Sequence, residues 1–212
     1  FHVLNFFIPR YLLARINTNA SLILFGLLAN LLCFSVSANV LTIGGIVHPE
    51  SACTTRDGRI FISEIGGVGK KGDGRILEVF TNGDKKVIAS GLNDPKGLLV
   101  EGNTIYVTDV DEIKKISFDG EVSSWIGPKD FPRKISFLND LTIDRNTIIY
   151  VSDSGEVVNG ERRGGAVYRI SSTGKVSLLV DSANDPNIQA PNGLLAFHRG
   201  FLMVAAFTTG VL

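Results

Sequence analysis

The sequence predicts an all-β protein that repeats one four-stranded unit. Three observations lead to this prediction: short runs that alternate apolar and polar residues, turn formers between the runs, and recurrence of the whole pattern. Three copies have a turn between two strands and end in an acid: residues 50–64 (ESACTTRDGRIFISE), 95–109 (PKGLLVEGNTIYVTD) and 139–153 (NDLTIDRNTIIYVSD). A weaker fourth copy starts at Pro191 (PNGLLAFHRGFLMVAA), and Ala206 stands there in place of the acid.

Each full copy is followed by a loop and a second strand pair. Asn82-Gly83, Asp119-Gly120 and Thr173-Gly174 separate the strands of these pairs, and Asn-Gly and Asp-Gly between alternating strands are strong hairpin signals. The intervening loop covers residues 66–74 in the first copy and residues 155–165 in the third. Each repeat therefore supplies four antiparallel strands in roughly 40 to 50 residues, the pattern of one blade of a β-propeller.

Residues 39–212 thus predict an incomplete β-propeller domain of about three and a half four-stranded blades. A blade cannot bury both faces alone, so blades stack around an axis in rings of at least about four. The repeats stop within a blade at Leu212, so we expect a longer parent with two or more further blades. Residues 39–212 alone would expose an unpaired sheet edge.

The composition excludes several classes of protein. Lys+Arg and Asp+Glu both number 21, and no block of like charge occurs, which argues against a nucleic-acid partner. Cys33 and Cys53 are the only cysteines, and we expect the first to be removed with the N-terminus. Neither an intramolecular disulfide nor a cysteine-based zinc site is then predicted. Cys53 is interpreted as a buried structural thiol.

Residues 1–38 have the layout of a secretory signal peptide. Arg10 and Arg15 precede an uncharged, mostly apolar run at residues 20–35, and Val36-Ser37-Ala38 provides small residues for cleavage after Ala38. We therefore expect a secreted or periplasmic protein with no membrane segment after cleavage. The alternative is a membrane anchor that stays uncleaved, although the run is shorter than the roughly 20 residues that span a bilayer.

Three motifs stand in order at the starts of the first, third and fourth copies. They are HPES at residues 48–51, FLND at residues 137–140 and PNG at residues 191–193. With them the chain resembles the senescence marker protein/gluconolactonase/regucalcin family, from about Pro49 onward. The resemblance implies a six-bladed β-propeller and, for the whole protein, metal-dependent hydrolysis of a small-molecule lactone, such as a sugar lactone, or a related ester.

The resemblance also implies a set of site residues. In the family an early Glu, two Asn and a later Asp surround a divalent cation. Carried onto this chain, the metal ligands are Glu50, Asn139 and Asn192, with Asp140 as the alternative to Asn139. The substrate-binding residues are Asn139 and Asp140. Oxygen ligands suit Ca²⁺ best, with Mg²⁺, Zn²⁺ or Mn²⁺ as alternatives. The Asp expected to act as general base lies beyond Leu212, so no catalytic residue is predicted within this chain.

A non-enzymatic function is the alternative. LNDPKGL at residues 92–98 also resembles propellers of the NHL-repeat type, which bind partners rather than catalyse. Such a protein would bind a protein or a small ligand at its channel mouth, and the fold alone does not separate the two functions. The proposed ligands also have structural readings, Glu50 as a solvated loop acid and the Asn residues as turn formers.

The acids that end the second strand of each repeat form a separate set. Glu64, Asp109 and Asp153 occupy the same place in three repeats. Because one acid per blade suits a repeated hydrogen-bonding role better than a single active site, we interpret these residues as structural.

Overall fold

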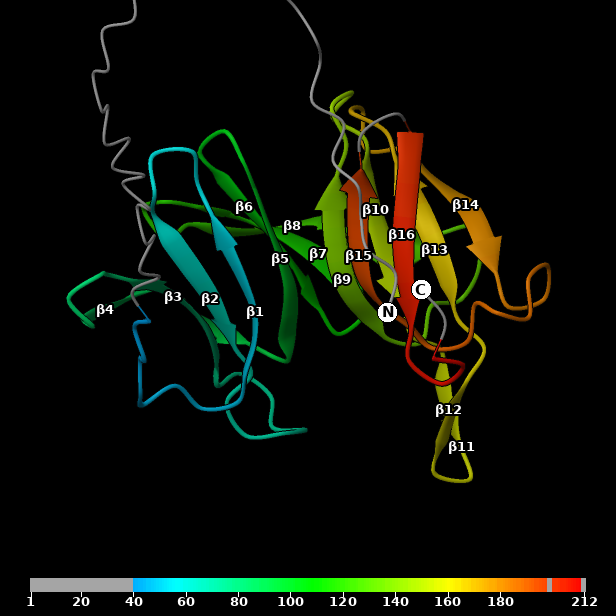
Figure 1. Ribbon diagram of the computed structural model, residues 1–212, viewed down its shortest axis with the longest axis horizontal. Helices are drawn as coiled ribbons and strands as arrows, with labels where there is room; N and C mark the ends of the chain where they lie inside the picture. The colour runs from blue at the N-terminus through cyan, green and yellow to red at the C-terminus, as the bar shows by residue number, and fades with distance from the viewer. Residues whose placement is uncertain (1–39, 198–199, 211–212) are drawn as a thin grey trace, which may run out of the picture. The chain divides into compact units, whose positions relative to one another are not determined.

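The computed structural model describes residues 40–197 and 200–210, so the predicted signal peptide and its cleavage site lie outside the described residues. The described part is all-β, with sixteen strands and one short 3-10 helix at Pro128–Asp130 (Figure 1). The strands form three four-stranded antiparallel sheets, a two-stranded sheet that follows them, and a small two-stranded hairpin. The all-β, propeller-like prediction is confirmed. No helix among the described residues is long and apolar enough to cross a membrane.

Each sheet follows the order of the chain, except for the hairpin inserted in the third. The first sheet contains β1 (Pro49–Thr54), β2 (Ile60–Glu64), β3 (Gly74–Val79) and β4 (Lys85–Leu92). The second contains β5 (Pro95–Glu101), β6 (Thr104–Asp109), β7 (Glu112–Ser117) and β8 (Val122–Ile126). The third contains β9 (Leu138–Ile143), β10 (Ile149–Asp153), β13 (Ala166–Ile170) and β14 (Val176–Asp181), and the last contains β15 (Pro191–Phe197) and β16 (Phe201–Ala206).

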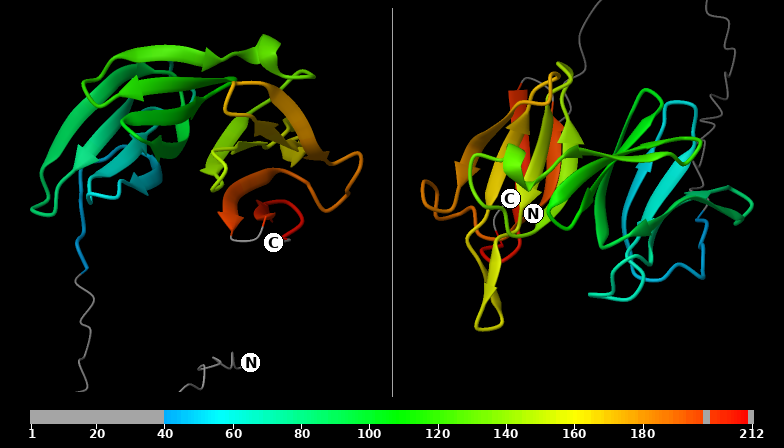
Figure 2. Two further views of the ribbon diagram at one scale, coloured as in Figure 1. Left: turned by 90° about the horizontal axis from the view of Figure 1, so that it is seen from above. Right: turned by 180° about the vertical axis from the view of Figure 1, so that it is seen from behind.

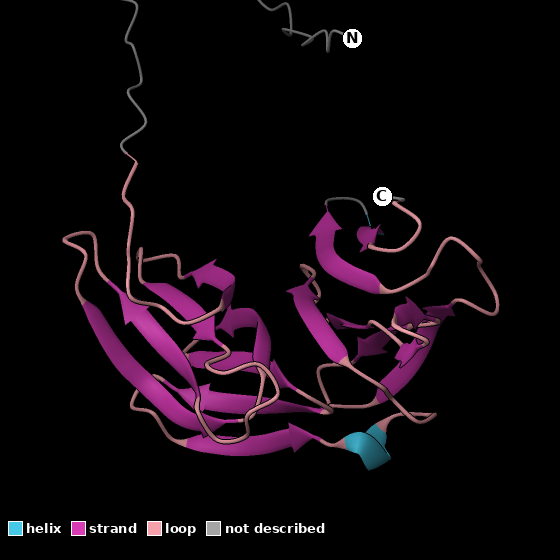
Figure 3. Ribbon diagram, turned by 90° about the horizontal axis from the view of Figure 1, so that it is seen from below, coloured by secondary structure: helices cyan, strands magenta, loops and turns pink. Residues whose placement is uncertain are grey.

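The strands that open the sheets lie next to one another. β1 lies beside β5, β5 beside β9, and β9 beside β15. The view from above in Figure 2 shows the sheets side by side in the order of the chain, and the view from below in Figure 3 shows the same side-by-side arrangement. Equivalent positions of successive sheets are therefore brought together, as in the centre of a propeller.

Apolar side chains fill the space between neighbouring sheets. Phe61 and Ile76 of the first sheet pack with Ile105 of the second, and all three are fully buried. Ile113 of the second sheet and Tyr168 of the third, both fully buried, belong to another apolar cluster. Because blades bury their faces only against each other, these clusters hold the repeats in their relative positions.

Every opening strand has a bulge at the same place. In the first sheet Pro49 pairs with Glu64 and Ala52 pairs with Ile62, so two residues, Glu50 and Ser51, stand opposite one. The same register shift occurs in the other sheets, at Lys96-Gly97, Asn139-Asp140 and Asn192-Gly193. A bulge redirects a side chain locally, so the first residue of each pair defines what we term the bulge position.

The repeated acids have the structural role predicted for them. Glu64 accepts a hydrogen bond from the Val47 amide at 3.1 Å. Asp109 accepts hydrogen bonds from two backbone amides at 2.7–3.2 Å, and Asp153 from three at 2.9–3.1 Å. Most of these donors lie just before the opening strand of the same sheet, so each acid fixes the entry of the chain into its blade.

The prediction of a plain loop at residues 155–165 is wrong. These residues contain a hairpin of two short strands, β11 (Glu156–Val158) and β12 (Glu161–Arg163). Asn159 and Gly160 turn the chain with φ angles of 54° and 83°. Strands of three residues are too short to show alternation in the sequence, which explains the error.

Candidate functional site

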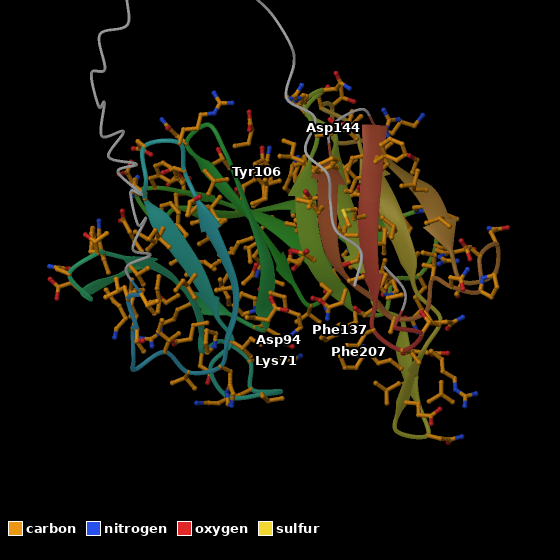
Figure 4. The ribbon with its side chains drawn as sticks, in the orientation of Figure 1. Lys71, Asp94, Tyr106, Phe137, Asp144 and Phe207 are labelled. Carbon is orange, nitrogen blue, oxygen red and sulfur yellow. The ribbon has the colours of Figure 1, made fainter. Side chains whose placement is uncertain are left out.

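A cavity of about 690 Å³ lies where the opening strands begin. All four bulge positions line it: Glu50, Lys96, Asn139 and Asn192. Phe137 and Phe207 line it too, and Figure 4 labels them at the end of the sheets opposite Asp144, the residue that follows β9. We refer to this space as the hub cavity.

Other segments complete the wall of the hub cavity. The β11–β12 hairpin contributes Gly160, Glu161 and Arg162, and the segment after β16 contributes Phe207 and Thr208. The cavity therefore combines one residue from each repeated strand with side chains of less regular segments.

Three of the four predicted site residues line this one cavity. Glu50, Asn139 and Asn192 are 53 or more residues apart in sequence and meet because they share the bulge position. Asp140 does not line the cavity. Its Oδ1 accepts a hydrogen bond from its neighbour Leu141 at 2.8 Å, and its Oδ2 accepts one from Leu194 at 2.7 Å. Its carboxylate thus ties β9 to β15.

The side-chain amide of Asn139 is held in one orientation. The Ser154 hydroxyl donates its proton to the Pro191 carbonyl at 2.7 Å, so it can only accept from Asn139 Nδ2, at 3.1 Å. Asn139 Oδ1 is then the other end of the amide, and it is buried without a hydrogen-bond partner among the described residues. A buried acceptor without a partner costs roughly 1–3 kcal/mol, so this oxygen marks a place for a ligand.

Glu50 supplies a carboxylate to the same cavity. Its side chain is solvent-exposed, yet the surrounding protein desolvates the carboxyl group enough to raise its pKa. The positive charge of Lys96 acts in the opposite direction, and the negative charges of Asp140 and Asp94 add to the increase in pKa. Within residues 40–197 and 200–210, the Glu50 carboxylate forms no ion pair.

Lys96 and Arg162 are cavity residues that the sequence analysis missed. Lys96 is only 7% exposed, and its Nζ donates to Asp94 Oδ1 at 3.0 Å. Aligning the repeats at PES, PKG, ND and PNG would have placed Lys96 in register with the three candidate ligands. Arg162 gave no such signal because it lies in the hairpin that was predicted as a loop.

The three candidate metal ligands in the hub cavity, Glu50, Asn139 and Asn192, offer oxygen atoms. One carboxylate and two amides are hard ligands of the kind that Ca²⁺ and Mg²⁺ take. No group of three or more His, Cys, Asp or Glu side chains that could hold a metal occurs in the part of the chain that the structure describes. The orphaned Asn139 oxygen is therefore the observation that fits a cation here.

A propeller-like protein with a carboxylate and amide side chains lining a cavity where its opening strands begin is the class that the fold and this site define. Solved structures with the same fold include a gluconolactonase from Xanthomonas campestris, with 19% identity, a TM-score of 0.62, and coverage of 78% of this chain and 57% of that one. A putative gluconolactonase has 16% identity and a TM-score of 0.57, with 77% and 57% covered. Regucalcin from Agrobacterium tumefaciens, described as calcium-binding, has 15% identity and a TM-score of 0.55, with 75% and 53% covered.

These structural neighbours are the kinds of protein that the sequence motifs resemble, so the expected fold is confirmed. The chain spans a little over half the length of each. No protein-family model and no curated protein sequence matches the chain.

Proposed function

We propose that the protein is a metal-dependent hydrolase of the gluconolactonase type, acting on a sugar lactone or a related ester. The observation that carries the proposal is the buried, unpartnered Oδ1 of Asn139, a residue that lines the same cavity as Glu50 and Asn192. The fold shared with gluconolactonases and with a calcium-binding regucalcin supports it.

Glu50, Asn139 and Asn192 would hold the cation, with Ca²⁺ the first candidate. A bound divalent cation polarises a carbonyl oxygen and makes a bound water more acidic. Two further residues would prepare the candidate ligands for cation binding. Ser154 fixes the Asn139 amide, and Lys96 lowers the pKa of Glu50 against the effect of desolvation.

Cation titration of the full-length protein tests the ligand set. We expect Glu50→Gln to weaken Ca²⁺ binding at least about ten-fold in calorimetry, because it removes the only carboxylate in the set. Glu101→Gln is the matched control, since Glu101 is an exposed acid at the far end of β5. Unchanged affinity in Glu50→Gln would remove Glu50 from the site.

Hydrolysis of sugar lactones, followed by the acid released with and without a chelator, tests the reaction. We expect hydrolysis that stops in the chelator. Cation binding without hydrolysis of any lactone would support the alternative, a propeller that binds a ligand without catalysis. One observation favours that alternative, because Lys96 places a positive charge at a bulge position beside the candidate cation ligands.

A further inference from the structure

We propose that Lys96, Arg162 and Phe137 form an anion-binding subsite in the hub cavity, and that the ligand it takes carries a carboxylate. The inference rests on the proposed function for the rest of that ligand, a polyhydroxy acid such as lactone hydrolysis releases. In that reaction water adds across the acyl C–O bond, which leaves a carboxylate, a hydroxyl group and one proton.

Lys96 distinguishes the second blade from the others. The bulge positions of the first, third and fourth blades carry oxygen acceptors, whereas the second carries an ammonium group. A charge so deeply buried requires partners. Asp94 takes one of the three Lys96 donors at 3.0 Å, so the ammonium group keeps donors for a ligand in the cavity that it lines.

Arg162 brings a second cation to the same cavity. Its Nη1 donates to the Gly155 carbonyl at 3.1 Å, which orients the side chain. Most of its five N–H donors stay available for a ligand. In residues 40–197 and 200–210 no carboxylate pairs with Arg162, whereas the adjacent Arg163 pairs with Glu161 at 3.1 Å. A guanidinium group with open donors matches a carboxylate in two parallel hydrogen bonds.

The ring of Phe137 brings the two cations together. Arg162 Cζ lies 3.9 Å from the ring centroid and Lys96 Nζ lies 4.7 Å from it. The negative face of the ring attracts both cations. Two positive charges held near the same ring also repel each other. An anion bound beside them in the cavity offsets that repulsion, so this part of the cavity is complementary to a negatively charged group.

Calorimetry on the full-length protein tests the subsite with D-gluconate as the probe. D-glucitol is the matched neutral compound, because it has a CH₂OH group where gluconate has its carboxylate. We expect gluconate to bind at least about ten-fold more tightly than glucitol, in a chelator as well as with Ca²⁺. Inorganic phosphate is the competing anion, and we expect it not to displace gluconate at equal concentration.

The variants assign the effect to residues. Arg162→Gln and the double variant Lys96→Met/Asp94→Asn should each weaken gluconate binding about ten-fold. The double variant removes both charges of a buried pair, so no unpaired charge is left to unfold the protein. Arg163→Gln is the control on the same hairpin and should change the affinity by less than about two-fold.

Equal affinity for gluconate and glucitol, or full gluconate affinity in a folded Arg162→Gln variant, would overturn the subsite. Displacement by phosphate would overturn the carboxylate assignment. The two proposals fail separately. Gluconate binding that depends on Arg162 without any lactone hydrolysis keeps the subsite and removes the hydrolase. Hydrolysis with wild-type KM and wild-type product inhibition in Arg162→Gln removes the subsite and keeps the hydrolase.

Discussion

Gly97 lies directly against the backbone of Asn139. A Cβ at residue 97 would come within 2.6 Å of the Asn139 carbonyl oxygen and within 2.6 Å of the Cα of Asp140. Backbone atoms cannot rotate away, so β5 and β9 would have to separate. We predict that Gly97→Ala lowers the free energy of unfolding by about 1–3 kcal/mol, the usual cost of overpacking, as measured by urea denaturation.

Gly193 is the matched control for this prediction. It occupies the equivalent place in β15, and a Cβ there would meet only the Ala205 Cβ, at 3.7 Å. Gly193→Ala should therefore leave the urea midpoint nearly unchanged. Equal destabilisation by the two substitutions would contradict the close packing of β5 against β9.

Ser154 is predicted to control cation affinity without being a ligand. Ser154→Ala removes the hydroxyl that fixes the Asn139 amide, so Oδ1 is no longer held in place. We expect Ca²⁺ affinity in calorimetry to fall about ten-fold, as for other residues that orient metal ligands. Ser152→Ala is the control, because Ser152 also bonds two backbone groups, the Asp140 amide and the Asn192 carbonyl, and does not contact the Asn139 side chain. Equal loss of affinity in both variants would mean that general loosening, rather than amide orientation, is responsible.

The repeat pattern predicted the fold well because local chemistry determines it. Alternation and turn dipeptides such as Asn82-Gly83 define hairpins without reference to the rest of the chain. The hairpins β3–β4, β7–β8 and β13–β14 turn at the three predicted dipeptides. The β11–β12 hairpin was missed because its strands contain three residues each. Asn159-Gly160 between them is a local hairpin signal, but strands this short show no alternation to support it.

The site was predictable to the extent that it follows the repeat. Glu50, Asn139 and Asn192 share a repeat position, so any stacking of the blades brings them to one cavity. Lys96 shares that position as well, but its ammonium group is not a metal ligand, so the resemblance did not point to it. Ser154 could not be predicted, because its role depends on a hydrogen bond to Pro191 across two blades.

Asp109 is predicted to matter for stability. Its carboxylate is inaccessible to solvent and accepts hydrogen bonds from two backbone amides. It also forms an ion pair with Lys114 at 2.6 Å. Asp109→Ala removes the acceptor of two backbone amides and leaves Lys114 with Glu112 as its remaining partner, so we expect a loss of roughly 2–4 kcal/mol in urea denaturation. The exposed neighbour Asp111 is the control, with an expected change within about 0.5 kcal/mol for Asp111→Ala. A small effect at Asp109 would contradict the structural role of the repeated acids.

Cys53 is predicted to be unreactive in the folded protein. Burial raises the pKa of its thiol to about 12, so almost no thiolate is present near neutral pH. Alkylation by iodoacetamide, located by peptide mass spectrometry, should be much slower in buffer than in concentrated urea. Equal rates in the two conditions would show that the thiol is not shielded.

Glu50 is predicted to make stability depend on pH when no cation is bound. Desolvation raises its pKa in the folded state above the ordinary value of 4.5. Such a carboxyl group contributes stability below its unfolded pKa, and this contribution is lost as the pH rises through the folded pKa. In a chelator, the wild type should therefore lose stability relative to Glu50→Gln between about pH 4.5 and neutrality.

Urea midpoints of the two proteins at several pH values across this window provide the measurement. Adding Ca²⁺ at neutral pH should raise the midpoint of the wild type and leave that of Glu50→Gln nearly unchanged, because a cation that binds only the native state stabilises it. A midpoint difference that stays constant with pH would mean that the Glu50 carboxyl group keeps its unfolded pKa on folding. The desolvated carboxylate that this site needs would then be absent.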